Sequence, residues 1–357
     1  MNLSKIDENF AIGSFQDDGN TRYYSIPCEP FDLYGVFYEK KAARFVRMPS
    51  EIADTVNEGV VAMNTYTAGS RIRFSTDSKS ISLVVRYSDL LEMAHMPLSG
   101  NAGFILLEET ERGFKHIKSF FPPHSAYDKS VKKGYSVNCD LCGKMANYIL
   151  YFPLYNDVKS LAIGLDKNAV VTHGKKYKDV KPILYYGSSI TQGGCASRAD
   201  NSYQQLVSEW SGFDYKILGF SGSAKAEDGM AEYLRNEDCD LFVCDYDYNA
   251  PSAEYLENTH QKIYRAFKSL KKHKNVPVIF LSKPDGLRGD DGEQRFNIIK
   301  KTYDDAVSRG EPVALIDGRK IYPDDAYSHC AVDGCHPNDL GFYFMAKAIY
   351  KAIKQFL

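Results

Sequence analysis

Four short apolar runs in the second half of the chain place the tightest limit on its fold. The runs are ILYY (183–186), DLFVCDY (240–246), VPVIFLS (276–282) and VALID (313–317). Segments with helical periodicity, such as AEYLENTHQKIYRAFKSLKKH, lie between them. Strands that alternate with helices in this way form a parallel sheet with helices on both faces. The second half is therefore predicted to be an α/β domain.

The first half has a different pattern. RIRFSTDSKSISLVVRY (71–87) and ANYILYFPLY (146–155) alternate or cluster β-branched and aromatic residues between turn residues, with little helical periodicity. This pattern predicts a β-sandwich. A chain of 357 residues has room for two domains, each with its own core. We predict a sandwich over 1–175 and an α/β domain over 176–357, joined by a lysine-rich linker.

Charge and hydropathy limit the partners of the chain. With 44 Lys and Arg against 46 Asp and Glu, the net charge of -2 gives no reason to expect nucleic acid or an anionic membrane as a partner. The first 15 residues are polar, and the chain has no run of about 18 apolar residues. These features predict a soluble, cytoplasmic protein with a small substrate; they leave its oligomeric state open.

The cysteines raise the question of a metal site. Cys139 and Cys142, in CDLC, have metal-ligand spacing, but a structural zinc site needs four ligands, and no second CxxC or HxxxH completes this one. The eight cysteines are scattered along a long chain, which favours reduced thiols over a disulfide framework. We expect neither a metal nor a disulfide.

A glycine-rich turn after the first apolar run suggests a nucleophile. In YYGSSITQGG (185–194) a strand stops at glycine and presents Ser189 at the carboxyl edge of the sheet, where open α/β sheets carry their chemistry. A serine hydroxyl needs a base and an orienting carboxylate. His336 lies in a loop before the last predicted helix, and Asp333 precedes it by three residues. This spacing lets Asp333 reach Nδ1 of His336.

Two further strand ends offer donors for an oxyanion. Gly222 follows the apolar segment YKILGF, where a glycine allows the backbone N–H to approach a substrate. Asn249 follows the strand 240–246 and carries an amide side chain. Either residue alone is better explained by an ordinary turn. Together with Ser189, they make acyl transfer the favoured chemistry.

These segments resemble the sequence blocks of a known superfamily. GSSIT, GFSGSA, DYN and DGCH occur in the order and at the strand ends found in the SGNH hydrolases, also called GDSL-like esterases. The likeness extends from about Lys181 to Leu357. It implies a flavodoxin-like, doubly wound fold and a hydrolase that needs no cofactor.

The resemblance also assigns roles to individual residues. Ser189 resembles the nucleophile, His336 the base and Asp333 its orienter. Gly222 and Asn249 resemble the oxyanion-hole donors, together with the Ser189 N–H. In this chain, Ser188 stands where the first block of the family usually has aspartate.

The first half resembles a particular subgroup. PFDLYG (30–35) is similar to the Gly-x-Asp-Leu-Tyr motif of SGNH enzymes with an N-terminal, jelly-roll-like β-sandwich, although Pro30 replaces the glycine. For Asp32 and Tyr34 we favour a sandwich corner over a direct catalytic role.

Two-domain enzymes of this type are similar to carbohydrate acetyl esterases. The resemblance therefore implies a serine esterase that hydrolyses short-chain, above all acetyl, esters on carbohydrates, with a small molecule or an imported oligosaccharide as its substrate. Two alternatives stay open: a lipase or thioesterase acting on acyl chains, and a non-catalytic carbohydrate-binding protein. Arg198, just after the nucleophile turn, either binds a substrate hydroxyl or pairs with a carboxylate.

Overall fold

The computed structural model describes residues 19–284 and 291–356. These residues form two compact units. Within the described ranges, unit 1 consists of residues 19–47, 65–176 and 197–200, and unit 2 of residues 48–64, 177–196 and 201–356.

The units differ from the predicted division at 175/176 in two places. Residues 48–64 belong to unit 2, although they lie in the first half of the sequence, and residues 197–200 belong to unit 1. The physical reason for the first difference is apolar packing, because Met48, Ala53 and Val60 are buried in the core of unit 2. A single break in the sequence does not describe the units.

Unit 1 is built mainly from antiparallel strands. The strands are β1 (Thr21–Ile26), β2 (Asp32–Tyr34), β3 (Phe37–Glu39), β4 (Arg44–Val46), β5 (Arg71–Thr76), β6 (Ser80–Arg86), β7 (Phe104–Thr110), β8 (Gly113–Phe120), β9 (Gly134–Asp140), β10 (Ala146–Tyr151), β11 (Ser160–Asp166) and β12 (Val171–His173), with the short helices α3 (Leu98–Asn101) and η3 (Lys129–Lys133) between them. The predicted strands at 71–87 and 146–155 are confirmed.

Two sheets share the core of unit 1. One has the order β1-β11-β6-β9, the other β12-β5-β10-β7-β8 with β2 also paired to β5, and the pairs within both sheets are antiparallel. Inward side chains of both sheets, such as Leu83, Ile163, Phe74 and Leu150, form one apolar cluster. Two sheets with a common core make a β-sandwich. The jelly-roll connectivity stays a prediction.

The Asp-Leu-Tyr motif forms β2 within this sandwich. Asp32 Oδ1 lies 2.9 Å from Nδ1 of His173, and its Oδ2 accepts the Gly174 N–H at 3.1 Å. The guanidinium of Arg71 lies 5.6 Å from the centre of the Tyr34 ring. These contacts, all within unit 1, favour the structural interpretation of the motif.

Unit 2 alternates strands and helices. Its strands are β13 (Ile183–Gly187), β14 (Tyr215–Gly219), β15 (Leu241–Asp245), β16 (Val278–Leu281) and β17 (Val313–Ile316), and its helices are α1 (Ser50–Ala53), α2 (Glu58–Met63), α4 (Ser189–Gln192), α5 (Tyr203–Ser211), α6 (Asp228–Asn236), α7 (Ala253–Lys268), α8 (Gly292–Ser308) and α9 (Asp339–Ile353). All four predicted apolar runs contain a strand.

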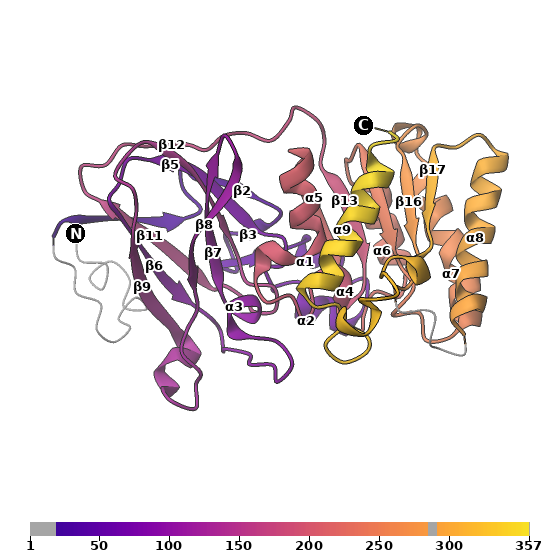
Figure 1. Cartoon of the computed structure of the whole chain (residues 1–357), viewed down its shortest axis with the longest axis horizontal. Coiled ribbons are helices and arrows are strands. Elements are labelled where there is room, and N and C mark those ends of the chain that lie inside the picture. The colour runs from indigo at the N-terminus through magenta and orange to yellow at the C-terminus, as the bar shows by residue number, and fades with distance from the viewer. Residues whose placement is uncertain (1–18, 285–290, 357) are drawn as a thin grey trace. The chain divides into compact units, whose positions relative to one another are not determined.

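The sheet of unit 2 is parallel, with the order β14-β13-β15-β16-β17. This is the flavodoxin-like order, which confirms the predicted α/β class. Side chains of alternate strand positions, such as Tyr186 and Phe280, pack with α6, α7 and α8. On the opposite face Tyr185 contacts Tyr203 of α5, which contacts Phe342 of α9. Figure 1 shows α5 beside α9 and α7 beside α8.

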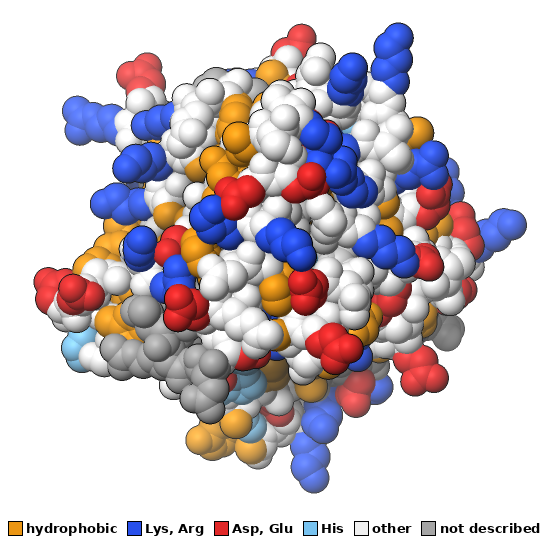
Figure 2. All heavy atoms as spheres, turned by 90° about the vertical axis from the view of Figure 1, so that its right-hand side faces the viewer, with side chains coloured by type: hydrophobic (Ala, Val, Ile, Leu, Met, Phe, Trp, Pro, Cys, Tyr) orange, Lys and Arg blue, Asp and Glu red, His pale blue; other side chains and the backbone are white. Residues whose placement is uncertain are grey.

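Charges of both signs are mixed on the face of the molecule that Figure 2 draws. On the face that Figure 2 shows, Lys and Arg side chains are interspersed with Asp and Glu. Over the two described ranges, no helix combines the length and the hydropathy that crossing a membrane requires.

Candidate active site

The nucleophile turn is shaped by the residues around Ser189. A Cβ at Gly187 would overlap Oγ1 of Thr191 and lie 2.5 Å from the Asp245 carbonyl oxygen, so only glycine fits at the end of β13. Ser188 caps α4, because its Oγ accepts the Ile190 N–H at 3.2 Å. Serine and aspartate are comparable N-caps, which explains why Ser188 can replace the aspartate usual in the family. Ser189 is then the first helical residue, at the carboxyl edge of the sheet.

His336 joins Ser189 to Asp333. Its Nε2 lies 2.9 Å from Oγ of Ser189, and its Nδ1 lies 2.7 Å from Oδ2 of Asp333. With Asp333 ionised, Nδ1–H donates to the carboxylate and Nε2 is left to accept the serine proton. The structure therefore brings the three predicted catalytic residues together in the order that serine hydrolysis requires.

The loop around Asp333 fixes its carboxylate. Oδ1 accepts the backbone N–H groups of Cys335 at 3.0 Å and His336 at 2.8 Å. Burial by itself would raise the pKa of Asp333, but these two hydrogen bonds and the one from the His336 ring outweigh it and lower the pKa to about 2. Asp333 is thus ionised at neutral pH and can stabilise an imidazolium.

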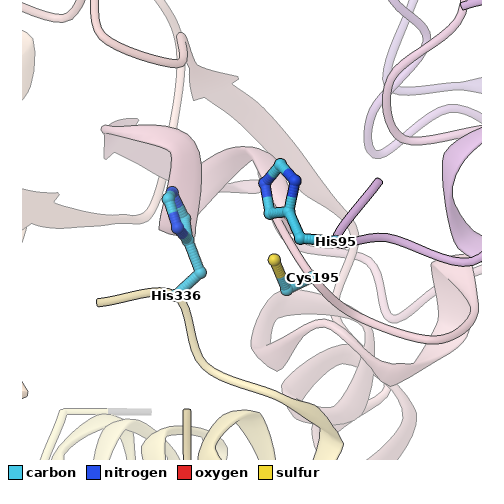
Figure 3. Close-up of side chains that lie close together, drawn as sticks. All are labelled: His95, Cys195 and His336. Atoms are coloured by element: carbon cyan, nitrogen blue, oxygen red, sulfur yellow. The ribbon is translucent and has the colours of Figure 1, made fainter. Parts of the chain in front are cut away.

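Cys195 lies beside His336, as Figure 3 shows, with its Sγ within 4.8 Å of a ring nitrogen. Burial, then the charge of Asp333 and the neighbouring Cys335, raise the pKa of the Cys195 thiol to about 12. At neutral pH this thiol is protonated and is therefore a poor nucleophile. Both ring nitrogens of His336 already face Asp333 and Ser189. All eight cysteines of the chain, including Cys139 and Cys142, are free thiols.

The Gly222 N–H is available to a ligand. Gly222 has φ +67°, a conformation that favours glycine, and it is exposed in the loop after β14. The N–H groups of its neighbours are used: Ser221 donates to Oε1 of Gln192 at 3.0 Å, and Ser223 donates to the Phe220 carbonyl at 3.0 Å. Among the residues that the structure describes, the Gly222 N–H has no hydrogen-bond partner.

Asn249 has an unused amide. It lies in the turn after β15, and its Oδ1 is buried with no partner among the described residues. The Asn249 amide is thus an unsatisfied polar group at a strand end. A buried polar group without a partner is costly unless a ligand completes it.

The turn that carries Asn249 is held by Arg295 of α8. Its Nη1 donates to the Asp247 carbonyl at 3.1 Å and contacts the Asp247 carboxylate at 3.2 Å, and its Nη2 donates to the Ala250 carbonyl at 3.1 Å. The Arg295 side chain is almost fully buried. Two residues that hold these loops were not predicted: Arg295 lies in no recognisable motif, and Gln192 lies within YYGSSITQGG, where no local signal indicates that its side chain binds the loop after β14.

Strand register explains how the site assembles. Gly187 of β13 pairs with Gly219 of β14 and with Asp245 of β15. Ser189, Gly222 and Asn249 follow these three residues by two to four positions, so they emerge at the same edge of the sheet. Of the predicted site residues, Arg198 alone belongs to unit 1, where its Nη2 pairs with Asp200 at 2.9 Å. The structure thus shows Arg198 paired with a carboxylate, which is one of the two roles that the sequence left open.

A flavodoxin-like sheet with a Ser-His-Asp arrangement at its carboxyl edge has the geometry of a serine hydrolase. Comparison with known families agrees. Residues 21–171 match the GxDLY model, described as the N-terminus of Esterase_SGNH_hydro-type, and residues 180–354 match the GDSL-like Lipase/Acylhydrolase family. The chain therefore belongs to the two-domain SGNH hydrolases, as the sequence blocks had predicted.

Solved structures support the same assignment. A protein from Bacteroides ovatus ATCC 8483, described as a GDSL-like lipase, is 26% identical, with a TM-score of 0.79 over 94% of this chain and 98% of that one. The salicylyl-acyltransferase SsfX3 from a tetracycline biosynthetic pathway shares the fold at 15% identity, with a TM-score of 0.77 over 94% of this chain and 97% of that one. A search of curated proteins gave no match.

Proposed function

We propose that this chain is a serine esterase that removes short acyl groups, acetyl above all, from carbohydrates. The observation that carries the proposal is the continuous hydrogen-bonded chain from Ser189 through His336 to Asp333. The unused Gly222 N–H and Asn249 amide supply what an ester's developing oxyanion needs.

The reaction proceeds through an acyl-enzyme. Ser189 Oγ attacks the ester carbonyl while His336 Nε2 takes the hydroxyl proton, and Asp333 stabilises the imidazolium that forms. The N–H groups of Ser189 and Gly222 and the Asn249 amide bind the oxyanion. His336 then gives its proton to the leaving alkoxide. A water molecule, deprotonated by His336, attacks the acyl-enzyme and releases the acid and Ser189.

The substrate class rests on the family rather than on contacts in the site. The order of a GxDLY sandwich before a GDSL-like domain is similar to that of carbohydrate acetyl esterases, and the family models support an ester hydrolase. The sugar alcohol would be the leaving group.

Two experiments test the proposal. Hydrolysis rates for p-nitrophenyl acetate, butyrate and octanoate should fall steeply with chain length, because a short-chain esterase has no place for a long acyl group. Ser189→Ala should abolish all turnover, while Ser308→Ala, a change of a remote exposed serine on α8, should not. A rate that rises toward octanoate would favour a lipase, and no turnover of any ester would favour a binding protein.

The second experiment measures acetate release from a panel of acetylated oligosaccharides. Release that depends on Ser189 and is faster than from p-nitrophenyl acetate would identify the sugar as part of the substrate. If acetate is released only from the p-nitrophenyl ester, the carbohydrate part of the proposal is wrong and the esterase part stands.

A further inference from the structure

A segment from the first half of the sequence packs on the proposed active site of unit 2. Residues 48–64 lie in the chain between β4 and β5, yet they belong to unit 2 and form α1 and α2. Met48, Ala53 and Val60 are at most 1% exposed and share an apolar cluster with side chains of α6. Burial of these three side chains anchors the segment, so its polar groups are held at defined positions.

Asn57 uses both ends of its amide. Its Oδ1 accepts the Val60 N–H at 2.9 Å, which makes it the N-cap of α2. Its Nδ2 donates to the Ser223 carbonyl at 2.9 Å and also to the Glu227 carboxylate. The opposite orientation of the amide would place Nδ2 against an N–H and Oδ1 against two oxygens, so the assignment is unambiguous.

Gly59 brings α2 close to the same loop. A Cβ at Gly59 would overlap Oγ of Ser223 and lie 2.8 Å from its Cβ. No side chain larger than hydrogen fits there without moving the loop. Asn57 and Gly59 therefore both act on Ser223, which directly follows Gly222.

Gly222 depends on such support from outside its own loop. The loop is held at Ser221 by Gln192, and Ser223 and Ala224 donate to the Phe220 carbonyl at 3.0 and 3.2 Å. The Ser223 carbonyl follows, and its donor is Asn57, which comes from outside the loop. Glycine has the most backbone freedom of any residue, so the direction of its N–H is set by the bonds on either side.

We propose that Asn57, with Gly59, is a positioning residue for the oxyanion hole: it fixes the Ser223–Ala224 peptide, and with it the loop that carries Gly222, so that the Gly222 N–H stays directed at the oxyanion. The inference rests on the proposed function, because it takes Gly222 as an oxyanion donor. It also assigns a catalytic purpose to a segment that interrupts the sandwich in sequence. Asn57 touches no reacting atom, so its effect acts through the loop.

The first test changes Asn57 while keeping its cap. Asn57→Ser retains an N-cap acceptor and lacks the donor that reaches Ser223, and Asn57→Asp retains the cap and places an oxygen against the Ser223 carbonyl and Glu227. Removal of a whole oxyanion donor costs about 10²–10³ in kcat. We expect a loosened loop to lower kcat about tenfold in Asn57→Ser and by more in Asn57→Asp. The KM for p-nitrophenyl acetate should change by less than about twofold.

The matched control is Thr55→Val in the same segment. The Thr55 hydroxyl donates to the Ile52 carbonyl, a bond within the segment, so its loss perturbs the segment without touching the loop at 221–224. We expect kcat of this variant to equal that of the wild type. Because the one tryptophan, Trp210, lies in unit 2, its fluorescence monitors the unfolding of that unit in every variant.

A second, independent test uses the packing of Gly59. Gly59→Ala should lower kcat, and adding Ser223→Gly should restore part of it, because the second change removes both atoms that the new Cβ meets. Because Ser223→Gly would also relieve a loss of stability, kcat is compared under conditions where Trp210 fluorescence shows that Gly59→Ala is folded. This pair also decides the question if the Asn57 variants fail to fold.

Covalent labelling of Ser189, which needs no turnover, distinguishes a failure of the positioning role from a failure of the proposed function. A p-nitrophenyl phosphonate should label Ser189, and the labelling rate measured by mass spectrometry depends on the oxyanion hole. An unlabelled wild type would show that the proposed function is wrong. A labelled wild type with the same labelling rate and kcat in folded Asn57→Ser, Asn57→Asp and Gly59→Ala would overturn the positioning role alone.

Discussion

Asp245 makes the stability of unit 2 depend on pH. It is fully buried at the end of β15, and its Oδ2 accepts hydrogen bonds from Thr191 at 2.8 Å and Tyr203 at 3.0 Å. Its Oδ1 is buried with no partner among the described residues. The pKa of Asp245 is raised to about 7. Burial is the main cause and the charge of Asp247 adds to it, while the two hydrogen bonds offset only part of the rise.

The direction of the effect follows from proton binding. Between pH 3.8, the ordinary value, and about 7 the native state holds a proton on Asp245 that the unfolded chain has released. The free energy of unfolding therefore falls as pH rises through this window and levels off above it. About 3 pH units at about 1.4 kcal/mol each amount to about 4 kcal/mol, of which somewhat under 2 kcal/mol is already lost at pH 5.

Asp245→Asn should remove this dependence. The asparagine Oδ1 can accept from both Thr191 and Tyr203, and its amide group replaces the unpartnered oxygen without a charge. Between pH 5 and pH 8 the wild type should lose about 3 kcal/mol more of its free energy of unfolding than the variant does.

Urea unfolding followed by Trp210 fluorescence at the two pH values measures this difference, since Trp210 is the one tryptophan and lies in α5 of unit 2. Asp324→Asn, an exposed change in the same unit, is the matched control and should behave as the wild type. Parallel pH dependence in the wild type and Asp245→Asn would refute the reasoning, because it would mean that Asp245 is ionised in the native state.

Three further predictions concern the site and the units. His336→Ala should reduce kcat by about 10⁴ or more and Asp333→Asn by less, since serine and histidine carry the proton chemistry; small, equal losses in stopped assays would place the base elsewhere. Arg295→Lys should lower kcat with little change in KM, because an ammonium cannot donate to two carbonyls in the geometry of a guanidinium fork; an unchanged kcat would show that the turn holds its shape without it. A chain that begins at Lys181 should aggregate, because it lacks the segment 48–64 that completes the core of unit 2, and a soluble, active product in size-exclusion chromatography would contradict this.

The residues that carry the proposed chemistry were predictable because their signals are local. Ser189 follows a strand that ends at glycine, and Asp333 precedes His336 by three residues in one loop. Gly222 and Asn249 follow apolar runs whose carboxyl ends meet in any parallel sheet. Their order along the chain, compared with a known superfamily, was sufficient to single them out.

The support around these residues was not predictable from the sequence. Asn57 contacts a carbonyl 166 positions away, and Arg295 reaches a turn 45 to 48 positions away. Neither residue belongs to a periodic pattern or a motif, so no local signal indicates its partner. Arg198, left open between a substrate and a carboxylate, pairs with Asp200, a partner that only the structure identifies.

The sequence by itself determined the α/β class, the strand positions and the catalytic candidates, because apolar periodicity and turn chemistry depend on neighbours a few residues apart. Tertiary structure decided that residues 48–64 belong to unit 2 and that Asn57 and Arg295 hold the two donor loops. Such contacts form only when the burial of apolar surface brings distant segments together. Their energy depends on three-dimensional packing, and the local pattern of residues does not encode it.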